Sequence, residues 1–142
     1  AVTISPEAVD GLTLGAAISN NTIGTNIDSD ENTMYAKYAT GGFTFGVQAS
    51  DLDHTTAASD QESIAYGVTY AVNDDFSIGY SYHELDFEST SLLDQESTGI
   101  SASYTMGGMT LAGATNEVDN MQCQSAAAND VEGYEFTLSF AF

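Results

Sequence analysis

The stretch that decides the fold reads Tyr66-Gly-Val-Thr-Tyr-Ala-Val-Asn-Asp-Asp-Phe-Ser-Ile-Gly-Tyr-Ser-Tyr82. Large apolar side chains occupy every second position on both sides of the central Asn-Asp-Asp segment. Strict alternation is typical of a β-strand, because successive strand residues point to opposite faces. Asn and Asp accept the backbone angles of a tight turn. The stretch therefore predicts two antiparallel strands joined by a hairpin.

The same alternation continues outward on both sides of this hairpin. Further segments that show it clearly begin at Leu12, Phe43, Ile100 and Tyr134. Residues 32 to 40 and 109 to 119 show it more loosely, and no segment has a convincing helical period. We therefore expect an all-β chain, an antiparallel up-and-down meander of eight strands, each about nine to eleven residues long.

Two kinds of connection alternate along this meander. The tight-turn signals are Gly41-Gly42, Asn73-Asp74-Asp75 and Gly107-Gly108. Longer polar segments lie at about residues 20 to 31, 52 to 61, 87 to 96 and 120 to 132. Alternate connections of a meander lie at the same end of the strands, so we expect all the long loops at one end. These segments hold most of the acidic residues, and that end is expected to be strongly negative.

Composition limits the possible functions. The 142 residues include 21 acidic side chains and a single cationic one, Lys37, for a net charge of -20. Nucleic-acid binding is excluded, because it depends on Lys and Arg contacts with phosphate. Charged residues are only 15% and apolar residues 42% of the chain, which argues for a folded domain. There is no apolar run long enough for a membrane-spanning helix and no sign of an uncleaved signal peptide. Cys123, the only cysteine, has no partner for a disulfide.

The two faces of the expected strands differ in kind. One face carries large apolar residues such as Tyr66 and Val68, while the other carries small ones such as Gly67 and Thr69. A closed soluble barrel of eight strands holds only roughly a dozen inward side chains, too few for the large set. A transmembrane β-barrel accounts for both faces, with the large residues toward lipid and the small ones toward a lumen. Aromatic residues near the strand ends fit interfacial girdles, namely Phe43, Tyr70, Phe76, Phe142, Tyr82 and Tyr134.

Small lumen residues also bear on the size of the barrel. Gly, Ser, Thr and Ala cannot fill a narrow interior, so the pattern favours a wide lumen, as in barrels of about sixteen strands. Residues 1–142 are thus either a single barrel domain or the C-terminal half of a larger barrel. Residues 1 to 10, with Pro6, suit a preceding loop or strand end. A complete small closed barrel stays open as an alternative.

The last strand carries a family resemblance. Gly133-Tyr-Glu-Phe-Thr-Leu-Ser-Phe-Ala-Phe142 resembles the end of a Gram-negative outer-membrane porin of the alphaproteobacterial general type. Its aromatic and apolar residues resemble the signal by which such proteins are recognised for barrel assembly: Tyr134, Phe136, Leu138, Phe140 and Phe142. The segments 66 to 82 and 99 to 111 are also porin-like, and the resemblance covers about residues 11 to 142.

This resemblance implies a protein of the bacterial outer membrane. It implies a sixteen-stranded barrel assembled as a homotrimer, with these strands as the last eight, and a long loop folded into the pore. Lipid, lipopolysaccharide and the barrel-assembly machinery are the implied partners. The family's constriction of basic and acidic residues carries over to no residue here, because the chain has no Arg and is short. The implied function is a passive channel for small hydrophilic solutes, and the acidic loops favour weak cation selectivity.

Individual residues suggest sites in two places. The lumen-facing candidates are Lys37, Thr69, His83 and Glu135. Carboxylates expected on the long loops are candidates for loose binding of divalent cations such as Ca²⁺: Asp28, Asp30, Glu31, Asp119, Asp130 and Glu132. The segment 28 to 32 opens like an EF-hand loop, but Thr33 replaces the turn glycine, so no EF-hand is expected.

No catalytic constellation is recognisable. His54 is expected in a long loop and His83 at a strand end, without a nucleophile in a known motif, so we expect no enzyme and no cofactor. The alternative from another class is a secreted, calcium-dependent β-sandwich that buries the large residues between two sheets and binds a partner through its acidic loops. The uncharged Ser, Gly and Thr face and the aromatic terminus favour the channel.

Overall fold

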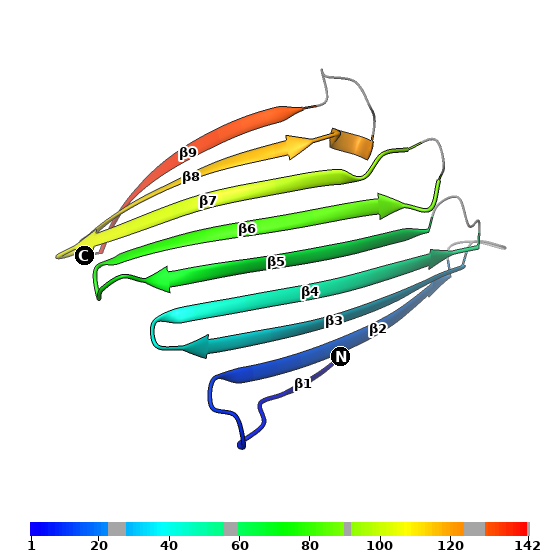
Figure 1. Ribbon diagram of the computed structural model, residues 1–142, viewed down its shortest axis with the longest axis horizontal. Coiled ribbons are helices and arrows are strands. Elements are labelled where there is room, and N and C mark those ends of the chain that lie inside the picture. The colour runs from blue at the N-terminus through cyan, green and yellow to red at the C-terminus, as the bar shows by residue number, and fades with distance from the viewer. Residues whose placement is uncertain (23–27, 56–59, 90–91, 124–129, 142) are drawn as a thin grey trace.

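A computed structural model describes residues 1–22, 28–55, 60–89, 92–123 and 130–141. Within these ranges, the strands form one antiparallel sheet in which each strand pairs with its neighbours in the sequence (Figure 1). The strands are β1 (Val2–Ile4), β2 (Leu12–Thr22), β3 (Asp28–Thr40), β4 (Phe43–His54), β5 (Gln61–Ala71), β6 (Phe76–Phe87), β7 (Gln95–Met106), β8 (Met109–Asp119) and β9 (Val131–Phe140). A short 3₁₀ turn, η2 (Met121–Cys123), precedes β9. The predicted up-and-down meander is confirmed.

The expected hairpins form at the expected places. Gly42, between β3 and β4, has a φ of 86°, and Gly107, between β7 and β8, has a φ of 62°; glycine reaches such angles without strain. Between β5 and β6, the side-chain oxygen of Asn73 accepts hydrogen bonds of 2.9 Å from the backbone N–H groups of Asp75 and Phe76. These turns lie together at one end of the sheet (Figure 1).

Two details differ from the sequence-based expectation. The first is the number of strands, which is nine in the described ranges where eight were expected; the ninth is β1, a strand end within residues 1 to 10 that pairs with Leu14 to Ala16. The second is strand length, since β3 has 13 residues and β4 has 12. Parts of the polar segments expected as long loops are therefore strand. Apolar alternation stops where polar residues begin, whereas backbone pairing continues as long as a neighbouring strand is present.

The sheet has two unlike faces. The register places Tyr66, Val68 and their cross-strand partners on one face, hereafter the outer face, and Gly67 and Thr69 on the other, the inner face. Large outer residues are exposed, as in Ile100, which is 59% accessible. On the inner face, side chains from neighbouring strands converge: a Cβ placed on Gly79 would lie 2.8 Å from Ser101 Oγ and 3.3 Å from Thr69 Cγ2. At Gly79, side chains from β5 and β7 therefore fill the space in front of the backbone.

The strands belong to one curved sheet that stays open within the described ranges, because β9 does not pair with β1 or β2 there. Neither a small closed barrel nor a two-layer sandwich matches this arrangement, so both alternatives raised from the sequence are wrong for the described residues. In the same ranges, no helix is long and apolar enough to cross a membrane. The curved wall supports the expectation that the chain forms part of a larger barrel.

Candidate functional site

The inner face is a hollowed wall of small polar residues. One row of paired residues crosses it from β3 to β9 and is rich in glycine: Lys37, Gly46, Gly67, Ser81, Gly99, Asn116 and Gly133. A Cβ on Gly46 or Gly133 would meet no atom within 4 Å. The missing side chains leave open space at these two positions, whereas a Cβ on Gly99 would lie 2.8 Å from the side chains of Ser81 and Asn116, which fill the space there.

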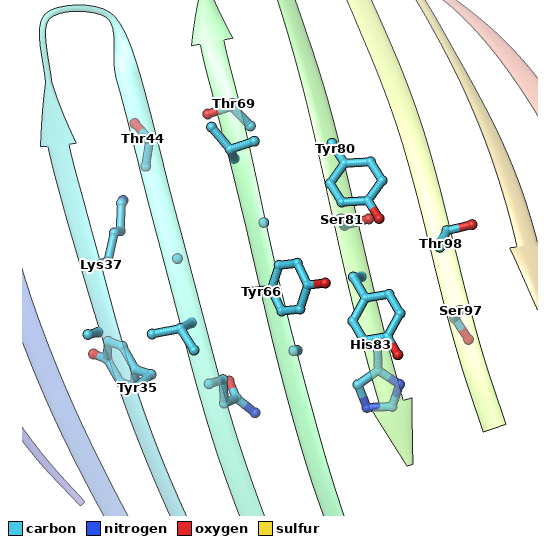
Figure 2. Close-up of a pocket in the computed structure, with 18 of the residues that line it drawn as sticks. Tyr35, Lys37, Thr44, Tyr66, Thr69, Tyr80, Ser81, His83, Ser97 and Thr98 are labelled. Carbon is cyan, nitrogen blue, oxygen red and sulfur yellow. The ribbon is translucent and has the colours of Figure 1, made fainter. Parts of the chain in front are cut away.

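The four lumen candidates all lie on this inner face but do not form one cluster. Lys37 pairs with Gly46, and His83 pairs with Ala65 and Ser97. Figure 2 shows Lys37, Thr69 and His83 on three different strands, β3, β5 and β6. Thr69 and Glu135 line a shared hollow of about 280 Å³ together with hydroxyls of neighbouring strands. His83 lies within β6 rather than at its end, and His54 ends β4 rather than lying in a loop.

The outer face carries the aromatic residues. The rings of Phe43 and Tyr70 stack at the tight-turn end with centroids 4.2 Å apart. The rings of Tyr66 and Tyr82 stack nearer the other end at 4.9 Å, and Figure 2 shows Tyr66 and Tyr80 projecting from adjacent strands. Such pairs suit the two interfaces of a membrane, and their role as girdles stays a prediction.

The proposed assembly residues are strongly exposed. Tyr134, Phe136, Leu138 and Phe140 share the outer face of β9, where Tyr134 is 81% and Phe136 is 77% accessible. Phe142 lies outside the described residues. The ring of Phe136 covers Gly113 on β8, since a Cβ there would lie 3.1 Å from two of its ring carbons. An exposed apolar strand at the edge of the sheet fits a surface that faces lipid or a partner.

The acidic residues are placed differently from what the sequence suggested. Eleven of them occupy outer-face positions at the long-loop end of the strands: Asp28, Asp30, Asp51, Asp53, Glu62, Glu84, Asp86, Glu96, Glu117, Asp119 and Glu132. Within the strands, only Glu31 and Glu135 are acidic residues of the inner face. The charge thus forms a band on the outside of the sheet, above the apolar surface. Extending the alternation beyond Ile64 and Tyr82 into the polar segments would have revealed this band.

The six carboxylates predicted as loop ligands for divalent cations do not come together. Five of them belong to strands, so their placement in loops was wrong; only Asp130 lies outside a strand. Asp28 and Asp30 share the outer face of β3, whereas Glu31 points to the inner face. Asp119 and Glu132 lie on β8 and β9, at the far side of the sheet from β3 (Figure 1). In the part of the chain that is described, no three His, Cys, Asp or Glu side chains are grouped to hold a metal ion.

A tight turn that the sequence did not predict follows β8. Asn120 Nδ2 donates a hydrogen bond of 3.0 Å to the backbone oxygen of Asp94, and the Asn120 N–H donates to the Asp130 carboxylate at 3.1 Å. Burial, and secondarily the Asp86 carboxylate, raise the pKa of Asp94 above its ordinary value. Cys123 is fully buried beneath this turn, and burial raises the pKa of its thiol. Asn120, Gln122 and Cys123 have positive φ angles of 53°, 64° and 57°. The asparagine at position 120 is the one sequence signal of this turn, because Asn tolerates such an angle.

Solved porins share this architecture. A porin refined at 1.8 Å resolution is 20% identical, with a TM-score of 0.78, and the match covers 97% of this chain and 49% of that one. Two mutants of Rh. blastica porin are each 14% identical, with TM-scores of 0.60 and 0.57, and the matches cover 95% of this chain and 47% of theirs. The chain spans about half the length of these structures. This likeness confirms the fold.

The sequence itself identifies the family. No curated protein matches the chain. The family described as Gram-negative porin, however, matches residues 2–142, which is nearly the whole sequence. The resemblance seen in the strand patterns and in the aromatic last strand is therefore confirmed. The chain belongs to the Gram-negative porin family, whose place is the bacterial outer membrane.

Proposed function

We propose that the chain forms part of the wall of a passive outer-membrane channel for small hydrophilic solutes. The carrying observation is the division of one sheet into an exposed apolar outer face and a hollowed inner face of Gly, Ser, Thr and Ala. Such an inner face hydrogen-bonds water without binding any solute tightly, which is what passage through a channel requires. The channel performs no chemical reaction and needs no cofactor for passage.

Weak cation selectivity is part of the proposal, and the sidedness of the charge explains why it is weak. On the strands, the inner face has two carboxylates, Glu31 and Glu135, and one cation, Lys37. Most carboxylates of the strands point outward, so they attract cations in the lumen only through the wall of the barrel. Loop carboxylates such as Asp60 and Asp94 add negative charge at one mouth, where salt screens it over about 10 Å at 0.1 M.

The test uses the intact native assembly in a planar bilayer with a salt gradient. We expect a reversal potential of weak cation selectivity that falls toward zero at high salt. Glu135→Gln on the inner face should reduce it, while the matched Glu117→Gln on the outer face should leave it unchanged. An assembly that does not conduct ions would contradict the proposed channel. Anion selectivity would show that residues outside this chain control the pore.

Assembly and divalent cations complete the proposal. A homotrimer in contact with lipid and lipopolysaccharide, inserted by the barrel-assembly machinery, fits the exposed outer face of β9.

Ca²⁺ is proposed to bind loosely at the acidic end, where it screens the repulsion between carboxylates, rather than at one ordered site. Limited proteolysis with and without Ca²⁺ at matched ionic strength tests this. Slower cleavage with Ca²⁺ supports the proposal, and identical cleavage contradicts it.

A further inference from the structure

His83 lies on the inner face near the middle of the wall. It belongs to β6, and the register pairs it with Ala65 on β5 and Ser97 on β7. Figure 2 shows β4 and β5 between His83 and Lys37, which lies on β3. The side chain of His83 is half-buried, so water still reaches it. Its imidazole therefore faces the lumen of the proposed channel.

A proton on His83 changes the charge balance of the inner face. On the strands, this face carries two carboxylates, Glu31 and Glu135, and one Lys or Arg side chain, Lys37. A histidine ordinarily gains its proton between about pH 8 and pH 5, where Asp and Glu ordinarily stay ionised. Protonated His83 is a second cation beside Lys37, and the excess of negative charge among these groups then disappears.

The surroundings of His83 do not neutralise this added charge. The inner-face residues that flank it on β5 and β7 are uncharged: Ser63, Ala65, Gly67, Gln95, Ser97 and Gly99. On β6, its inner-face neighbours are Ser81 and Leu85. The turn η2 packs against β6 through Cys123, whose thiol donates a hydrogen bond of 3.7 Å to the Leu85 oxygen and stays neutral because burial raises its pKa. Glu84, the next residue of β6, points to the outer face.

The charged residues of the inner face lie far from His83. Lys37 on β3 and Glu135 on β9 are each three strands away, in opposite directions along the sheet. Neighbouring strands lie about 4.8 Å apart, so three strands span about 14 Å, which exceeds the screening length of about 10 Å at 0.1 M salt. Neither side chain therefore offsets a charge on His83, and His83 determines the charge of the wall between them.

A second histidine of the inner face provides a comparison. His54 ends β4 and pairs with Ser29. Its backbone N–H donates a hydrogen bond of 2.6 Å to the Asp60 carboxylate. This is the acidic, long-loop end of the sheet, where the surrounding carboxylates offset one added proton. His54 and His83 thus share a residue type and a face but differ in their charged surroundings.

We propose that protonation of His83 lowers the cation selectivity of the channel, so that the selectivity for small inorganic ions depends on pH between about 8 and 5. The added charge repels cations and attracts anions in the lumen beside β6. The proposal rests on the proposed function, because only a conducting lumen has a selectivity that a proton can change.

The experiment records reversal potentials of the intact native assembly in a planar bilayer under a KCl gradient near 0.1 M, at about pH 7.5 and about pH 5.5. The permeability ratio of K⁺ to Cl⁻ in the parent should fall about twofold at the lower pH. His83→Asn, which stays neutral, should lose most of this fall. His83→Lys, which stays charged, should show the lower ratio at both pH values. His54→Asn should keep most of the parent's response.

The outcomes separate this proposal from the proposed function. A conducting pore whose response to pH is the same in His83→Asn as in the parent overturns the role of His83 alone, as does a His54→Asn variant that loses as much of the response. An assembly that does not conduct overturns the channel and the role of His83 together. At about 1 M salt, where screening acts over about 3 Å, the difference between parent and His83→Asn should shrink. An undiminished difference would overturn the proposal, because the proton would then act by changing the conformation of the wall.

Discussion

The inner and outer faces of the sheet are made from the same strands and yet follow different rules. On β5, Val68 and Thr69 are neighbours in sequence, but Val68 belongs to the apolar outer face and Thr69 to the small, polar inner face. The faces also differ in charge, since the acidic band is almost entirely an outer feature. Net charge alone therefore does not tell on which face of the sheet the charged side chains lie. The two-residue alternation along each strand determines the face.

The largest expected effect comes from placing a charge on each face in turn. Val68→Arg should cost about 2–4 kcal/mol of folding free energy in lipid, because it puts a cation against hydrocarbon near the midplane. Thr69→Arg should cost much less, because its side chain reaches water. Folding titrations of both variants of the intact protein in lipid vesicles measure the difference. Equal costs would overturn the assignment of the faces.

A second substitution compares two places within the inner face. Gly79→Val should destabilise the protein by about 1–3 kcal/mol, because the added carbons press on Ser101 and Thr69. Gly46→Val places its Cβ in open space and should cost almost nothing, since a β-branched residue suits a strand. Unfolding midpoints in detergent measure both. A cost at Gly46 as large as that at Gly79 would show that the wall at Gly46 is packed rather than hollow.

Smaller effects compare one cross-strand pair from each face. The stacked rings of Phe43 and Tyr70 on the outer face should couple by about 0.5–1.5 kcal/mol. On the inner face, the hydroxyls of Thr33 and Ser50 lie 2.9 Å apart and should couple by about 0.2–1 kcal/mol. Double-mutant cycles to Ala give both energies. A stronger inner pair would mean that polar contacts, and not aromatic ones, hold the strands in register.

Much of this architecture could be predicted because each strand signal is local. The alternation around Tyr66 and the turn at Asn73 predict a hairpin from neighbouring residues alone. Where pairing continues beyond the apolar surface, as from Ala49 to His54 on β4, the sequence is polar and gives no strand signal, so the lengths were underestimated. Backbone pairing there depends on the neighbouring strand, which no local pattern records.

The candidate site was only partly predictable for the same reason. The alternation along each strand places four candidates on one face, namely Lys37, Thr69, His83 and Glu135. The distances between them depend on which strands they occupy. The acidic residues were assigned to loops because polar sequence normally indicates loops. Their true positions follow only when the register across β4, β5 and β6 is known.

The smallest expected effect concerns the long-loop end of the sheet, where the chain passes from one strand to the next. Asp94 lies between β6 and β7, and burial, followed by the nearby Asp86 carboxylate, raises its pKa above the ordinary value of 3.8. The folded protein therefore holds a proton on Asp94 at a pH at which the unfolded chain has lost it. The stability contributed by protonated Asp94 is fully present below pH 3.8 and is lost as the pH rises through the raised pKa. At neutral pH the ionised carboxylate destabilises the folded protein.

Replacing Asp94 by Asn removes this destabilising charge and keeps the size of the side chain. Asp94→Asn should therefore raise the unfolding midpoint slightly at pH 7, and the gain should shrink as the pH falls through the raised pKa and vanish below 3.8, where the parent is protonated in both states. Denaturant unfolding of the intact protein in detergent at several pH values measures the difference. Repulsion among the other carboxylates is common to both proteins and largely cancels. Glu88→Gln, which removes one charge from the same end, shows how much of the gain is general. A gain from Asp94→Asn that stays constant with pH would mean that the amide acts through a new hydrogen bond, and the Asp94 carboxylate would then not limit stability at the loop end.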